Sequence, residues 1–138
     1  MKILVIDDEQ AVRYALTRIL ESNGFEVAAA PDGLRGMALF RHQHPDLVIT
    51  DLIMPEQEGI QTIQQLRKED PNIKILAISG GGRLVNIDFL QLAARLGADE
   101  VLAKPFESQE LLSIVRNLLP MTTAPTPPNG TYAAQRTA

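Results

Sequence analysis

The stretch Lys2-Ile-Leu-Val-Ile-Asp-Asp-Glu9 (KILVIDDE) indicates the fold class of this chain. Its four consecutive apolar residues, Ile3 to Ile6, end abruptly at Asp7 and Asp8. A short apolar run of this kind is typical of a strand that is buried on both faces, as in a parallel sheet. Apolar residues then recur at helical spacing as far as Asn23-Gly24, so a helix is predicted after the strand.

The same alternation of strand and helix continues along the chain. Further strands are predicted at 25–30, 46–50, 73–78 and 101–102, and further helices at 34–42, at about 59–69, around Phe89, Leu90, Ala93 and Leu96, and around Leu111, Leu112, Val115, Leu118 and Leu119. Five strands alternating with five helices predict an α/β fold with a doubly wound parallel sheet, because right-handed crossovers place helices on both faces. Periodicity does not reveal the order of the strands.

Length and composition limit the classes of protein that need to be considered. The chain has 138 residues, a net charge of −4 and no cysteine. Its acidic balance disfavours direct binding to nucleic acid or to an anionic membrane, and the lack of cysteine excludes disulfides and zinc–thiolate sites. No apolar run approaches the roughly 18 residues of a membrane span, so we expect a cytoplasmic protein with no membrane contact.

The chain divides into two parts by composition. Residues 1–120 carry the alternating pattern and are predicted to form one domain. Residues 121–138 hold five threonines, three prolines and no acidic residue. Because this composition buries little apolar area, we expect a disordered tail or linker stub there.

Polar side chains follow four of the predicted strands at the point where each strand ends. These are Asp7 and Asp8, Asp51, Ser79 and Lys104. In an open parallel sheet the carboxyl ends of the strands share one edge, where functional groups gather. Two carboxylates about 4 Å apart repel by roughly 4 kcal/mol at an effective dielectric of about 20, so a positive charge is expected among them. Hard oxygen ligands without histidine or cysteine suit Mg²⁺.

Each of these residues also has a purely structural interpretation. Asp8 can cap the first helix, Asp46 and Asp51 can be turn residues at strand ends, and Lys104 can be a solvated lysine. Five such residues at the same edge of four strands favour a shared site over five unrelated roles.

At these residues the sequence resembles the receiver domain of bacterial two-component response regulators. The matching segments are 6–9 (IDDE), 51–55 (DLIMP), Ser79 and 104–106 (KPF), and the resemblance runs from Met1 to about Pro120. It implies a flavodoxin-like sheet with strand order 2-1-3-4-5.

The resemblance also implies a role for each site residue. Asp51 is expected to accept a phosphoryl group, with Mg²⁺ held by Asp8, Asp51 and the main-chain carbonyl of Ile53, and oriented by Asp7 through water. Ser79 is expected to hydrogen-bond one phosphoryl oxygen and Lys104 to neutralise another, with a cis Lys104–Pro105 bond. The donor is expected to be a histidine kinase or phosphotransfer protein. A conformational change of the Ser79 loop and of the face formed by the fourth helix, the fifth strand and the fifth helix is expected to carry the signal to an output protein of unknown identity. On this view the chain is a phosphoacceptor signalling protein and not an enzyme.

Several positions near the predicted site bear on switching and signal lifetime, and one of them departs from the family pattern. Val101 stands where the family usually has an aromatic residue that moves with the switch hydroxyl. Three glycines, 80–82, follow Ser79, as either a mobile switch loop or a tight turn. Ile53 and Gly81 flank the expected approach of water to the phosphorus, and neither orients a water molecule, so slow self-dephosphorylation is expected.

Three other functions remain as alternatives. A degenerate receiver that only binds proteins is disfavoured by the presence of Asp8, Asp51 and Lys104, although Val101 leaves it open. A flavin- or dinucleotide-binding enzyme needs a phosphate loop after the first strand, where this chain has acidic residues instead. An aspartate-based phosphatase needs a second acid two residues after its nucleophile, and that position is Ile53.

Overall fold

The computed structural model describes residues 1–52, 58–79, 91, 94–95 and 97–120. The helices and strands are, in chain order, β1 (Lys2–Ile6), α1 (Gln10–Glu21), β2 (Glu26–Ala30), α2 (Gly33–Gln43), β3 (Leu47–Asp51), α3 (Glu58–Glu69), β4 (Lys74–Ser79), β5 (Glu100–Ala103) and α5 (Ser108–Leu118). The predicted bounds of β3 and β4 are one residue too early. Asp51 and Ser79 therefore belong to their strands as the last residues, and their backbones are held in the sheet.

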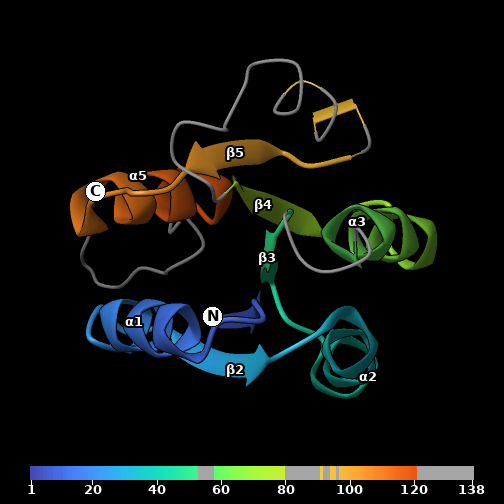
Figure 1. Ribbon diagram of the computed structural model, residues 1–138, viewed down its shortest axis with the longest axis horizontal. Helices are drawn as coiled ribbons and strands as arrows, with labels where there is room; N and C mark the ends of the chain where they lie inside the picture. Colours follow the sequence, from blue (N-terminus) through green and yellow to red (C-terminus); the bar gives the residue numbers. More distant parts are fainter. Residues whose placement is uncertain (53–57, 80–90, 92–93, 96, 121–138) are drawn as a thin grey trace, which may run out of the picture.

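The five strands form one sheet in the order β2-β1-β3-β4-β5 (Figure 1). All four neighbouring pairs are parallel, which confirms the predicted doubly wound sheet. In the register, Asp51 lies beside Ile78 and Ser79 beside Ala103. Because β1 and β3 are neighbours at the point where the winding reverses, Asp7 and Asp51 emerge side by side at the carboxyl edge.

The described residues contain four helices, whereas the sequence pattern predicts five. The fifth predicted helix falls between β4 and β5, where most residues lie outside the described ones and the described residues 91, 94 and 95 are helical. Outside them also lie Ile53, glycines 80–82 and the predicted tail at 121–138.

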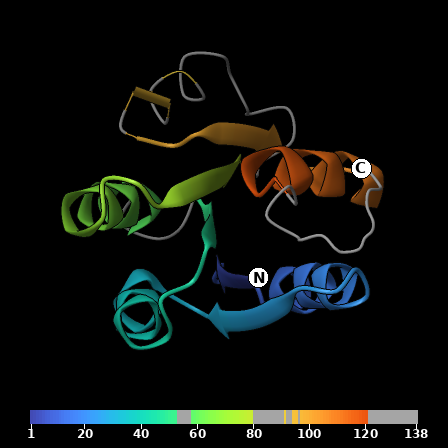
Figure 2. The same cartoon turned by 180° about the vertical axis from the view of Figure 1, so that it is seen from behind.

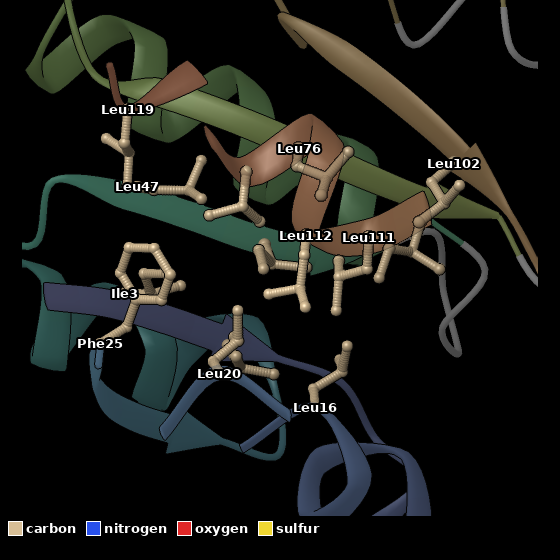
Figure 3. Packing of buried hydrophobic residues seen from close by; sticks show 14 residues of the cluster. Ile3, Leu16, Leu20, Phe25, Leu47, Leu76, Leu102, Leu111, Leu112 and Leu119 are labelled. Atoms are coloured by element: carbon tan, nitrogen blue, oxygen red, sulfur yellow. The ribbon is translucent and has the colours of Figure 1, made fainter. Parts of the chain in front are cut away.

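The helices cover the two faces of the sheet in pairs. Figures 1 and 2 show α1 and α5 on one face and α2 and α3 on the other. Successive residues of β1 point to opposite faces, so Ile3 packs in the core under α1 and α5 (Figure 3), while Leu4 packs in the core under α2 and α3. This two-sided burial explains why the strand is a continuous apolar run and not an alternating one.

Helix α5 begins shortly after the segment that carries Lys104. A capping box joins Glu107 and Glu110 at its start, because each side chain accepts a hydrogen bond from the other residue's backbone N–H. Such a box satisfies two N–H groups that the helix itself leaves unpaired. Phe106 is half-buried and packs against the core under α1 and α5. The segment carrying Lys104 is therefore anchored on its C-terminal side.

Among the described residues, the helices are too short or too polar to span a lipid bilayer.

Candidate functional site

Three carboxylates meet at the carboxyl edge of the sheet. Asp7, Asp8 and Asp51 each offer an oxygen atom, and these atoms all lie within 4.8 Å of one another. Asp7 and Asp51 are almost completely buried, with 1% and 3% exposure, and Asp8 is exposed. The tertiary structure thus brings together the three acids that the sequence analysis placed at this edge.

Lys104 lies among these acids as their counterion. Its Nζ is 3.3 Å from Asp7 Oδ2, 3.3 Å from Asp51 Oδ2 and 3.4 Å from Glu9 Oε1. The Lys104 backbone N–H donates to Ser79 O at 2.8 Å, and the Lys104–Pro105 peptide bond is cis, as the resemblance implies. Because the Lys104 side chain is only 17% exposed, the interpretation as a solvated lysine is wrong.

The charge of Lys104 is stabilised despite its burial. Burial alone would lower the pKa of the ammonium group, but the negative charges of Asp51 and Asp7, and hydrogen bonds to both, outweigh it and raise that pKa above its ordinary value. Lys104 is therefore a full positive charge at neutral pH, as the repulsion among the acids requires.

The loop between β1 and α1 is held by hydrogen bonds on both sides of Asp8. The Glu9 N–H donates to Asp7 Oδ1 at 2.9 Å, and Arg13 Nη1 donates to Asp7 O at 2.7 Å. The N-cap of α1 is Glu9, which makes no side-chain cap, so the interpretation of Asp8 as a helix cap is wrong. The sequence analysis quoted Glu9 only as part of the matching segment 6–9, and it assigned no role to Glu9 or Arg13. The signal available was their spacing, because a residue four positions after the N-cap lies in the first turn.

Ser79 is fully buried at the end of β4. Among the described residues, its Oγ has no hydrogen-bond partner. A buried hydroxyl without a partner is costly, and native structures contain few of them. The Ser79 hydroxyl is therefore available to bond a group that enters the site.

Helix α3 begins in direct contact with the end of β3. A Cβ atom added to Gly59 would lie 2.0 Å from Asp51 O and 2.7 Å from Leu52 Cα. Only glycine permits this approach, so the first turn of α3 supports the backbone of Asp51 from one side.

Two residues considered in the sequence analysis lie away from the acid cluster. The Asp46 carboxylate accepts a hydrogen bond from Lys2 N at 2.9 Å, at the opposite end of β3, so it has the structural role considered for it. Val101 is half-buried on β5 and packs against the core under α2 and α3.

Fold and site together define a class of protein: a doubly wound α/β domain with a buried acid–lysine cluster at its topological switch point. The profile of the response regulator receiver domain matches residues 3–116. The chain therefore belongs to the response regulator receiver family.

Individual relatives support this assignment. The chain is 39% identical over 121 residues to "Probable transcriptional regulator ycf27" of Porphyridium aerugineum, covering 86% of this chain and 48% of that protein. It is 36% identical over 126 residues to response regulator MprA of Mycobacterium sp. (strain KMS), covering 88% and 52%. A crystal structure of a response regulator receiver domain protein from Clostridium thermocellum superposes with a TM-score of 0.79 at 33% identity, covering 88% of this chain and 96% of that one. The chain thus spans about half the length of these curated relatives and nearly all of a solved receiver domain.

Proposed function

We propose that this chain accepts a phosphoryl group on Asp51 from a histidine kinase or phosphotransfer protein, in a reaction that requires Mg²⁺. The phosphorylated form then signals to an output protein by a conformational change that begins at Ser79. In this role the protein is a phosphoacceptor and not an enzyme acting on a separate substrate, and we place it in the cytoplasm.

The observation that carries this proposal is the position of Lys104 between Asp7 and Asp51. Its Nζ lies 3.3 Å from an oxygen of each buried carboxylate. Phosphoryl transfer requires mainly positioning and neutralisation of charge on the transferred group. A buried nucleophilic carboxylate with an ammonium group in contact meets both requirements.

The proposed step exchanges one bond to phosphorus for another. A carboxylate oxygen of Asp51 forms the new P–O bond, while the P–N bond of the donor phosphohistidine breaks and the imidazole leaves with the electron pair. Lys104 turns from the carboxylates to an oxygen of the arriving phosphoryl group, and the Ser79 hydroxyl donates to another. Once an Asp51 oxygen is bonded to phosphorus, the carboxylate has lost its charge, and Lys104 neutralises the phosphoryl group instead.

The residues of the site fit a Mg²⁺ ion. Three carboxylate oxygens within 4.8 Å of one another, without nitrogen or sulfur donors, form a hard ligand set of the kind that Mg²⁺ prefers. Asp8 and Asp51 would hold the ion directly and Asp7 through water, with the carbonyl of Ile53, which lies outside the described residues, as a further ligand. The bound ion supplies charge neutralisation to the oxygens of the transferred group.

An apolar groove next to the site suits the docking of a donor protein. The groove has a volume of about 520 Å³ and is lined by five residues of α1 together with Lys104, Pro105 and Phe106. A donor helix lying in it would bring its phosphohistidine to the exposed side of the acid cluster, where Asp8 and Glu9 face solvent. For the output protein, we propose the face formed by β5, α5 and the helix predicted between β4 and β5, most of which lies outside the described residues.

The direct test uses a small-molecule donor, so that no particular kinase is needed. The purified protein is incubated with acetyl phosphate and Mg²⁺, and intact-mass spectrometry follows the addition of one phosphoryl group. We expect modification of the wild type and of Asp46→Asn, which removes an acid outside the site, and none of Asp51→Asn. Equal modification of Asp51→Asn would contradict the assignment of the nucleophile.

The same test distinguishes the proposed phosphoacceptor from the main alternative, a degenerate receiver. A degenerate receiver would bind partner proteins without accepting a phosphoryl group from acetyl phosphate or the mimic beryllofluoride. Failure of both reagents in the presence of Mg²⁺ would favour that alternative. Bound flavin in the purified protein would instead favour the enzyme alternative.

A further inference from the structure

Asp8 differs from the other two acids of the cluster in how it is held. Asp7 and Asp51 are buried and contact Lys104, whereas Asp8 is exposed and has no hydrogen-bond or ion-pair partner among the described residues. Its carboxylate nonetheless lies within 4.8 Å of the other two. The position of Asp8 must therefore be determined by its backbone.

One residue binds the backbone on both sides of Asp8. Arg13 Nη1 donates to the carbonyl of Asp7 at 2.7 Å, and the Arg13 backbone N–H donates to the carbonyl of Glu9 at 3.0 Å. The first contact comes from the side chain, and the second is a backbone hydrogen bond of the first turn of α1. Arg13 thus ties the residue before Asp8 and the residue after it to a single point on the helix.

No side-chain cap holds the backbone around Asp8 at the start of α1. Glu9 is the N-cap residue, but its carboxylate lies 3.4 Å from Lys104 Nζ and does not bond the free N–H groups of the helix. The entry into the helix is held instead by the Glu9 N–H, which donates to Asp7 Oδ1 at 2.9 Å, and by the Arg13 side chain. The hydrogen bond from the Arg13 side chain is thus a main constraint on the Asp7–Glu9 loop.

Arg13 acts through a carbonyl and not as a counterion. Among the described residues it takes part in no ion pair, and Lys104 is the cation that contacts the cluster. We infer that Arg13 is a positioning residue for the divalent-cation site, which holds Asp8 in place by fixing the carbonyl groups that flank it. This inference rests on the proposed function, because it concerns how that site is prepared for Mg²⁺.

The direction in which Mg²⁺ affinity changes when Arg13 is replaced shows whether Arg13 positions Asp8 or acts only through its charge. Removing a positive charge near an acidic cluster would by itself strengthen the binding of a cation. Loss of an outer-shell partner of a metal ligand typically weakens metal affinity by about 10- to 100-fold. The two mechanisms therefore predict opposite changes in Mg²⁺ affinity when Arg13 is replaced.

The experiment measures Mg²⁺ affinity by calorimetry on the full chain, with the metal alone, for Arg13→Met, Arg13→Lys and Arg18→Met. Arg18 is the matched control, because it is an exposed arginine of α1 whose side chain bonds, within the described part of the chain, only to Tyr14. We expect about 10-fold weaker binding for Arg13→Met, a smaller loss for Arg13→Lys, and unchanged or slightly stronger binding for Arg18→Met. At saturating Mg²⁺, the rate of phosphorylation of Arg13→Met by acetyl phosphate should return toward that of the wild type.

Two results would overturn the inference and are distinct from failure of the proposed function. Arg13→Met binding Mg²⁺ as tightly as the wild type would show that Asp8 needs no such support. Weakening of equal size in Arg18→Met would show that any disturbance of α1 lowers the affinity, and not the loss of the contact between Arg13 and Asp7. If Arg13→Met does not fold, the affinity of Arg13→Lys decides the question in the same way. A wild type that binds no Mg²⁺ would instead contradict the proposed cation site itself.

Discussion

Gly59, in the first turn of α3, lies so close to Asp51 that a Cβ atom on it would be 2.0 Å from the Asp51 carbonyl oxygen. The helix thus contacts the backbone of the proposed phosphoacceptor directly. A contact this close makes the position of Asp51 sensitive to the smallest change in the helix.

We expect Gly59→Ala to impair both stability and phosphorylation. The added methyl group meets backbone atoms that cannot rotate away, and overpacking of this kind costs about 1–3 kcal/mol. Because the displaced atoms belong to Asp51, phosphorylation by acetyl phosphate should slow even under conditions in which the variant is fully folded. Urea unfolding and the rate of phosphorylation measure the two effects.

Gly36→Ala is the matched control for this variant. Its Cβ would meet Ile6 Cδ1 at 2.4 Å and Ile6 Cγ1 at 2.8 Å, so its nearest neighbours are side-chain atoms and not, as at Gly59, backbone atoms of Asp51 and Leu52. It should therefore lower stability without slowing phosphorylation of the folded protein. If both variants slowed phosphorylation equally, the specific role of the Gly59 contact would be refuted.

Lys104→Met should destabilise the protein by leaving two buried carboxylates without their counterion. Removing one partner of a buried ion pair costs about 3 kcal/mol or more. Adding Asp51→Asn to Lys104→Met should recover part of this loss, because one of the uncompensated charges is then gone. A double-mutant cycle of urea unfolding measures the interaction free energy between Lys104 and Asp51. If the losses of unfolding free energy in the two single variants simply add, the proposed interaction is contradicted.

The contribution of Lys104 also has a defined pH dependence. The folded state raises the pKa of Lys104 above its ordinary value of 10.5, so the folded protein holds that proton more tightly than the unfolded chain. The stabilisation is fully present below pH 10.5 and is lost as the pH rises through the higher pKa of the folded state. The difference in unfolding free energy between wild type and Lys104→Met should thus shrink at strongly alkaline pH. Replacing the exposed Lys74 by methionine should produce no such trend.

Ser79→Ala should stabilise the unphosphorylated protein while weakening its response. Among the described residues the buried Oγ has no partner, and removing an unsatisfied buried hydroxyl relieves a penalty of about 1 kcal/mol. The same change removes the donor that is proposed to bond the phosphoryl group, so beryllofluoride should cause smaller NMR shifts in the variant. Ser113→Ala, an exposed change on α5, should alter neither quantity. Destabilisation by Ser79→Ala would indicate that the hydroxyl is already bonded in the resting state.

The lifetime of the phosphorylated form is predicted from the resemblance, because Ile53 and Gly81 lie outside the described residues. Neither side chain accepts a hydrogen bond from an attacking water, so the wild type should lose its phosphoryl group slowly. Ile53→Asn and Gly81→Glu should speed the loss severalfold, within the factor of about 10² that a well-placed acid or base contributes. Decay is followed after removal of the donor, with Gln64→Glu on the exposed side of α3 as control. Rapid decay of the wild type would refute the prediction.

The sequence by itself determined the fold class and the members of the acid cluster. Both follow from local signals: the length of each apolar run, the spacing of apolar residues in the helices, and the polar residue at the end of each strand. Because the carboxyl ends of parallel strands share one edge, Asp7, Asp51 and Lys104 could be assigned to one site before any distance was known. The strand order came only from resemblance, since crossovers of similar length allow several orders.

Only the tertiary structure decided how the members of the site contact one another. The contact of Lys104 with Asp7 joins residues 97 positions apart, and no periodicity encodes a distance of that kind. The same holds for the approach of Gly59 to Asp51 and for the missing partner of the Ser79 hydroxyl among the described residues. A sequence pattern specifies which face or edge a residue occupies, whereas separations of a few Å depend on how helices and strands pack, which many residues determine together.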